Sequence, residues 1–112
     1  GCDTPSSTAW KVCNELVAAG VASGCNEKCE RLHTTIRFPL TGTGSHGCVY
    51  AYDSEREFER DQHGHREVDR IFEQHGQRPH RYIDAERRVD VMLVHGADAD
   101  ARSAAQRIVD AL

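Results

Sequence analysis

The stretch that decides the fold is residues 88–95, which read Arg-Val-Asp-Val-Met-Leu-Val-His. Its apolar side chains alternate between the two faces of an extended chain: Val89, Val91 and Leu93 on one, Met92 and Val94 on the other. A strand that is apolar on both faces is typical of the interior of a sheet, because both of its faces are covered. The sequence therefore predicts a central β-strand here.

The neighbouring segments extend this strand into a β-β-α unit. Residues 80–84 predict a second, shorter strand, and a turn at residues 84–86 connects the two. After the central strand, Asp98 or Asp100 can cap a helix. The apolar residues of that helix follow helical spacing: Ala101, Ala104, Ala105, Ile108 and Leu112.

The first half of the chain predicts a helix followed by a hairpin. Ser7 or Thr8 can cap a helix that carries Trp10, Cys13, Leu16 and Val17 on one face and ends at Gly20. Residues 30–38 then alternate with period two, which predicts a half-buried strand. Residues 48–52 form a second strand, and the glycine-rich loop before it is too long for a two-residue turn.

A long polar segment in the middle of the chain predicts a further helix. Asp53 or Ser54 can cap it, with Glu57 placed as in a capping box. Its apolar residues are expected to face the core: Phe58, Val68, Ile71 and Phe72. Residues 61–65 are polar and include Gly64, which costs about 1 kcal/mol inside a helix, so we expect a weakened or broken middle. Gly76 and Pro79 end the element.

These elements predict an α+β fold in the order α-β-β-α-β-β-α. We expect a mainly antiparallel sheet of three or four strands with the helices packed on one face. A chain of 112 residues has the length of one domain. Residues 1–7 are expected to form a flexible leader or tether, and residues 8–112 a single α+β domain.

Composition and charge exclude several classes of protein. The net charge is −4, from 14 basic and 18 acidic residues that are interspersed along the chain, which argues against nucleic-acid binding. The apolar stretches are far shorter than the roughly 20 residues of a membrane-spanning helix. Four arginines near the predicted 80–84 strand are expected to form a solvated edge, with binding of an anion or of a partner's acidic patch as the alternative: Arg78, Arg81, Arg87 and Arg88.

Five cysteines in the first 48 residues carry the most information about location. Cys2 follows Gly1 and precedes a polar segment, an arrangement that looks like the mature end of a bacterial lipoprotein, so Cys2 is the predicted lipidation site. The other four, Cys13, Cys25, Cys29 and Cys48, are expected to form two disulfides, with three pairings open. A four-cysteine zinc site or a redox pair are the alternatives.

Short motifs throughout the chain resemble those of small bacterial lipoproteins of uncharacterised function. The resemblance rests on Cys13-x-x-Leu16 leading through residues 18–22 to Cys25, on Tyr52-Asp53 at a helix start, and on residues 79–82 together with the 88–94 strand and the terminal helix. It implies an exported domain, periplasmic or on the cell surface, and a disulfide between Cys13 and Cys25. It implies no activity, cofactor or ligand.

The leading hypothesis is therefore a non-enzymatic, lipid-anchored interaction or accessory module of the cell envelope. It would bind an unknown protein partner and contact the membrane only through Cys2, with no catalytic residues, metal or cofactor. The first alternative is a metal-binding protein that uses its cysteines or His63 and His65. On a regular helix those histidines point about 200° apart, so they share an ion only if Gly64 breaks the helix. The second alternative is a thiol oxidoreductase that uses Cys25 and Cys29.

Overall fold

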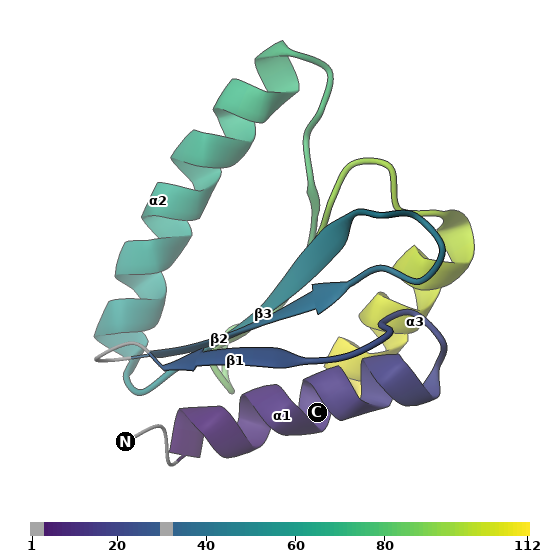
Figure 1. Cartoon of the computed structure of the whole chain (residues 1–112). Coiled ribbons are helices and arrows are strands. Elements are labelled where there is room, and N and C mark those ends of the chain that lie inside the picture. The colour runs from purple at the N-terminus through teal and green to yellow at the C-terminus, as the bar shows by residue number, and fades with distance from the viewer. Residues whose placement is uncertain (1–3, 30–32) are drawn as a thin grey trace.

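The computed structural model describes residues 4–29 and 33–112, and within them it shows an α+β fold of three helices and one antiparallel sheet (Figure 1). The five strands lie in the order β1-β2-β3-β5-β4. The elements are α1 (Thr4–Ala18), β1 (Asn26–Cys29), β2 (His33–Pro39), β3 (His46–Tyr52), α2 (Glu55–Gln74), β4 (His80–Asp84), β5 (Val89–Leu93) and α3 (Ala99–Asp110).

The main hydrophobic core lies between one face of the sheet and helices α1 and α3. Val91 of β5 pairs with Val49 of β3, and both are fully buried against the two helices. Leu16 of α1 and Ala105 of α3 are also fully buried in this core. Since every second residue of β5 points into the core, the predicted interior strand is confirmed: β5 lies between β3 and β4.

Helix α2 covers the opposite face of the sheet (Figure 1). Its Gln62 hydrogen-bonds to Asp90 of β5, whose neighbours Val89 and Val91 point into the main core. The expectation that all helices pack on one face is therefore wrong for α2. The physical reason is visible in β5: Asp90 and Met92 lie on the face away from α1 and α3, and a buried carboxylate there needs a covering partner.

The sheet has one more strand than expected, because β1 was not predicted. Both predicted hairpins, β2–β3 and β4–β5, are confirmed as antiparallel pairs. Strand β1 is an edge strand that pairs with β2, and its residues Asn26, Glu27 and Lys28 are exposed. Three consecutive polar, exposed residues carry no period-two apolar signal, so the sequence pattern did not reveal this strand.

Two helices differ from their predicted bounds. Helix α1 begins at Thr4, inside the expected leader 1–7, while residues 1–3, including Cys2, lie outside the described residues. Helix α2 runs unbroken through Gly64, so the predicted break in its middle is wrong. Its cap is confirmed, because the Ser54 side chain accepts a hydrogen bond from the backbone N–H of Glu57. None of the helices in the described ranges is long and apolar enough to cross a membrane.

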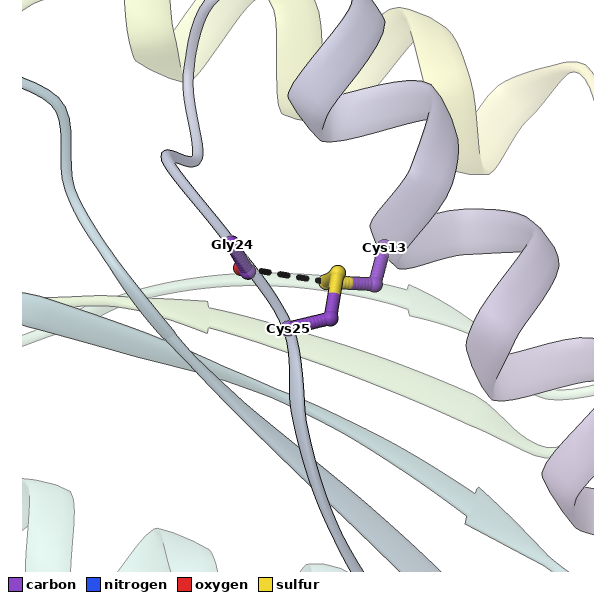
Figure 2. Close-up of a disulfide and its surroundings, with 3 residues drawn as sticks. All are labelled: Cys13, Gly24 and Cys25. Atoms are coloured by element: carbon purple, nitrogen blue, oxygen red, sulfur yellow. Dashed lines mark hydrogen bonds between the residues drawn. A yellow bond between two sulfur atoms is a disulfide. The ribbon is translucent and has the colours of Figure 1, made fainter.

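A disulfide between Cys13 and Cys25 joins α1 to the segment that enters β1 (Figure 2). The two Cα atoms are 6.3 Å apart, and Cys13 is fully buried. The Sγ atom of Cys13 lies 3.8 Å from the carbonyl oxygen of Gly24; a bonded sulfur has no proton to donate, so this is a close packing contact. The bond closes the chain over a sequence separation of 12 residues.

Gly47 marks a point where the neighbouring strands β2 and β5 leave no room for a side chain on β3. It lies in β3, and a Cβ atom there would be 2.6 Å from the carbonyl oxygen of Met92 and would overlap the ring of Phe38. Phe38 is fully buried, so its ring occupies the space that any larger residue would need. Glycine at this position is therefore a packing requirement of the sheet.

Candidate functional site

Asp90 is the centre of a buried polar cluster between β5 and α2. The residue is fully buried, and its Oδ2 atom accepts hydrogen bonds from Gln62 Nε2 at 2.7 Å and Arg81 Nη1 at 3.1 Å. His65 Nδ1 lies 3.0 Å from the same oxygen, and a proton on that nitrogen completes a third hydrogen bond. The other carboxylate oxygen, Oδ1, is buried and has no hydrogen-bond partner among the described residues.

Arg81 links the sheet to the helix. Arg81 lies in β4 and forms a bidentate ion pair with Asp69 of α2. Its Nε donates to Oδ2 at 2.6 Å and its Nη2 donates to Oδ1 at 3.0 Å. Burial acts to lower the pKa of Arg81, but the hydrogen bond to Asp69 and the charges of Asp90 and Asp69 outweigh it, so the pKa is raised. Arg81 is therefore charged, and two carboxylates share its charge.

Two tyrosines and a thiol complete the polar side of this sheet face. The rings of Tyr50 and His65 pack with centroids 4.7 Å apart, and Tyr52 packs edge-on against Phe58 at 5.6 Å. Burial and the neighbouring Cys48 raise the pKa of Tyr50, and burial raises the pKa of the Cys48 thiol. Both groups stay protonated at neutral pH, so Cys48 is a poor nucleophile.

Beyond the charged cluster, α2 and the sheet enclose a groove of about 550 Å³, which we call the α2 groove. Its apolar wall comes from Val68 and Phe72 of α2 on one side and from Met92 and Val94 on the other. Pro79 also lines the groove. The polar lining residues are His46, Tyr50, His65, Asp69, Gln77, Arg81 and His95. Although seven of the twelve lining residues are polar, most of the surface that they and the apolar residues expose to the groove is apolar.

The apolar residues of α2 are where the core prediction fails. Phe58 is buried as expected, at 5% exposure, but Val68, Ile71 and Phe72 are 47%, 55% and 49% exposed. In Figure 1 the helix leans away from the sheet toward its C-terminal end. The charged cluster attaches the middle of α2, and the last turns stand clear of the sheet, so their apolar side chains line the groove instead of a core.

Histidines and arginines gather at the open end of the α2 groove. Arg37 Nη2 donates to His46 Nδ1 at 3.2 Å, which leaves the proton of a neutral His46 on Nε2. Burial and the charge of Arg37 lower the pKa of His46. His95 Nδ1 lies 3.1 Å from the carbonyl oxygen of Arg78, and the His95 ring stacks on that of His80.

The predicted cysteine roles are met only in part. Cys13 and Cys25 form the disulfide that the lipoprotein resemblance implies. Cys48 is a buried free thiol, so the expected second bridge through it is wrong. Cys48 pairs with Arg37 and Cys29 with Thr34, which separates the two by β2 and by about 10 Å across the sheet, too far for a disulfide. The side chain of Cys29 lies outside the described residues.

Among the residues whose side chains are described, neither a redox cysteine pair nor a metal site is assembled. Cys25 is bonded to Cys13, so it is not paired with Cys29 as a redox centre. Because α2 is continuous at Gly64, His63 is exposed while His65 turns inward to Asp90, and the two cannot share an ion. Within residues whose side chains are described, no three His, Cys, Asp or Glu residues are grouped to hold a metal.

Sequence reasoning missed the residues that define the site. Arg81 was expected on a solvated strand edge, yet its side chain is only 14% exposed. Asp69 and Gln62 looked like ordinary polar residues of a helix surface. One signal was present: Asp90 is the single charge in the apolar strand Val89–Leu93, and a charge on an interior strand requires partners.

Comparison of the chain with protein-family models, with curated proteins and with solved structures gives no match. The chemistry of the α2 groove is therefore the basis on which a function can be proposed. That groove is the concave, mainly apolar site with convergent polar groups that small-molecule binding requires.

Proposed function

We propose that this protein is an exported, disulfide-braced, non-enzymatic accessory domain of the cell envelope, anchored through Cys2, that binds a small apolar ligand in the α2 groove. The observation that carries the proposal is the groove itself. Its volume of about 550 Å³ falls inside the range of about 300 to 1,000 Å³ that is typical of small-molecule sites.

Two features of the groove support a ligand. Val68 and Phe72 leave about half of their surface exposed, beside Met92 and Val94 on the opposite wall. Exposed apolar surface that is gathered in one concavity marks a binding site more often than scattered apolar residues do. Asp69, Arg81 and Asp90 Oδ2 at the groove's inner end are engaged with one another, so a ligand there would contact mainly the apolar wall.

The disulfide supports the proposed location. Cys13–Cys25 is a bond that persists in oxidising compartments and is rare in the cytosol. Gly1-Cys2 followed by a polar segment supports anchoring by lipidation. The expected protein partner would then pass the ligand to this domain, or take it from this domain, at the envelope.

Binding is tested with the neutral fluorescent probe N-phenyl-1-naphthylamine. The protein should enhance its fluorescence, and Phe72→Glu should abolish the enhancement by placing a charge in the apolar wall. Ile71→Glu is the matched control, because Ile71 is 55% exposed on the same helix and does not line the groove. Equal binding by both variants would place the probe elsewhere and remove the proposal.

Anchoring is tested separately, in the natural host. A clickable palmitate analogue should label the wild-type protein and not Cys2→Ser. Cys13 and Cys25 should resist alkylation in cells until reductant is added, since they are bonded to each other. Absence of label, or rapid alkylation of both thiols, would rule out the proposed envelope location.

A further inference from the structure

We infer that the ligand of the α2 groove is an amphiphilic carboxylate, an acyl-chain or aryl-alkyl carboxylic acid, whose apolar body lies along Val68, Phe72, Met92 and Val94 and whose carboxylate meets His46. This inference rests on the proposed function, and it names the chemical class of the ligand. It is argued from the distribution of charge and hydrogen-bond donors around the groove.

The inner end of the groove does not accept an anion. The carboxylates of Asp69 and Asp90 lie there, and Arg81 is paired with both of them. Three nitrogens of Arg81 are engaged by those carboxylates, and both oxygens of Asp69 are taken. An acidic headgroup at this end would meet two carboxylates and few free donors.

The outer end has the opposite character. Arg37 and Arg78 lie there with His46 and His95, and Glu73 is bound by Arg78 at 2.7 Å. Arg37 is exposed, and among the described residues no carboxylate forms an ion pair with it; its guanidinium contacts His46 instead. The charge of Arg37 is therefore available to an anionic group at the groove mouth.

The hydrogen-bond geometry selects an acceptor at this position. Arg37 donates to Nδ1 of His46, so a neutral His46 ring carries its proton on Nε2 and presents a donor. His46 lines the groove, so its ring can offer this donor to a ligand. A carboxylate accepts from such donors and is attracted by Arg37, and charge-assisted hydrogen bonds of this kind are roughly twice as strong as neutral ones.

Three probes of equal chain length separate charge from apolar burial: dodecanoate, dodecan-1-ol and dodecyltrimethylammonium. Each is used at neutral pH to displace N-phenyl-1-naphthylamine from the wild-type protein, the two ionic probes below their micelle concentrations and the alcohol below its solubility limit. Dodecanoate should bind about tenfold more tightly than dodecan-1-ol, the effect expected for one good charge-assisted contact. The double variant Arg37→Gln/His46→Gln should lose this preference and keep its affinity for dodecan-1-ol. Arg107→Gln, on the opposite side of the sheet in α3, should keep both.

The outcomes distinguish the two proposals. Equal affinities for acid and alcohol, tighter binding of the ammonium probe, or a preference for the acid that survives in Arg37→Gln/His46→Gln would each overturn the carboxylate assignment. In those cases displacement of the dye by the alcohol still supports an apolar groove. Failure of the dye and of all three dodecyl probes to bind would overturn the proposed function and this inference together.

Discussion

Replacing Arg81 by methionine tests whether charged contacts hold α2 on the sheet. Methionine keeps much of the side-chain volume and removes the guanidinium that contacts Asp69 and Asp90. The two carboxylates are 5% and 0% exposed, so neither regains water in the folded protein. Removing one partner of a buried ion pair costs about 3–5 kcal/mol, and we expect Arg81→Met to lower the free energy of unfolding by that amount.

The measurement is equilibrium urea denaturation followed by far-ultraviolet circular dichroism. Arg87→Met is the matched control, because Arg87 also binds acidic residues, Asp84 at 3.2 Å and Glu86 at 3.9 Å, but is 48% exposed. An exposed ion pair contributes about 0–1 kcal/mol, so the control should unfold close to wild type. The difference between the two variants then isolates the effect of burial.

A rescue variant tests the physical cause. If the loss in Arg81→Met comes from uncompensated carboxylates, Arg81→Met/Asp69→Leu/Asp90→Val should regain most of the lost stability, because an apolar cluster of similar volume often matches a buried ion network. A free energy of unfolding for Arg81→Met within about 1 kcal/mol of that for Arg87→Met, the range of exposed pairs, would show that burial of the ion pairs does not matter. A stabilising role of the Arg81 contacts is then refuted. It is equally refuted if the triple variant is no more stable than Arg81→Met.

Three further predictions use the same denaturation measurement. Gly47→Ala should lower the free energy of unfolding by about 1–3 kcal/mol through overpacking. Gly64→Ala should raise it by about 1 kcal/mol, because a Cβ atom there meets nothing within 4 Å. Equal effects of the two substitutions would contradict the packing argument. Burial and the charge of Asp61 raise the pKa of Tyr52 above its ordinary 10.0. As the pH rises above 10, the unfolded chain therefore loses this proton before the folded protein does. The free energy of unfolding then falls by up to about 1.4 kcal/mol per pH unit. Tyr52→Phe should flatten that alkaline decline, and an unchanged slope would show that other groups cause it. Cys13→Ala/Cys25→Ala should lose about 3 kcal/mol, the loop-closure value for a separation of 12, and a loss below 1 kcal/mol would contradict it.

The strands and hairpins were predictable from the sequence where burial imposes a period. In β2 the residues Thr34, Ile36 and Phe38 are buried and alternate with partly or fully exposed neighbours, and this is the pattern on which the prediction rested. Strand β1 was not predictable, since Asn26, Glu27 and Lys28 are polar and exposed and carry no apolar period. The cap at Ser54 was predictable because it is a local hydrogen bond.

The continuity of α2 and the position of its faces were not predictable in the same way. Gly64 lowers local helix propensity, yet Gln62 and His65 on either side of it bind Asp90, and these tertiary contacts offset a penalty of about 1 kcal/mol. The half-exposed Val68 and Phe72 have the spacing of core residues. Periodicity shows which residues share a face of a helix, and it does not show how far that face lies from the sheet.

The groove follows from the way α2 is attached. Hydrogen bonds and ion pairs hold their partners at fixed separations of about 3 Å in defined directions, so the contacts from Gln62, His65 and Asp69 set the height and tilt of the helix over β5 and β4. Apolar packing alone would draw the last turns of α2 onto Met92 and Val94. With the middle of the helix fixed by charges, those turns remain apart from the sheet, and the space they leave is the α2 groove. The rescue variant with an apolar cluster should therefore recover stability and lose affinity for N-phenyl-1-naphthylamine, because its helix is free to close.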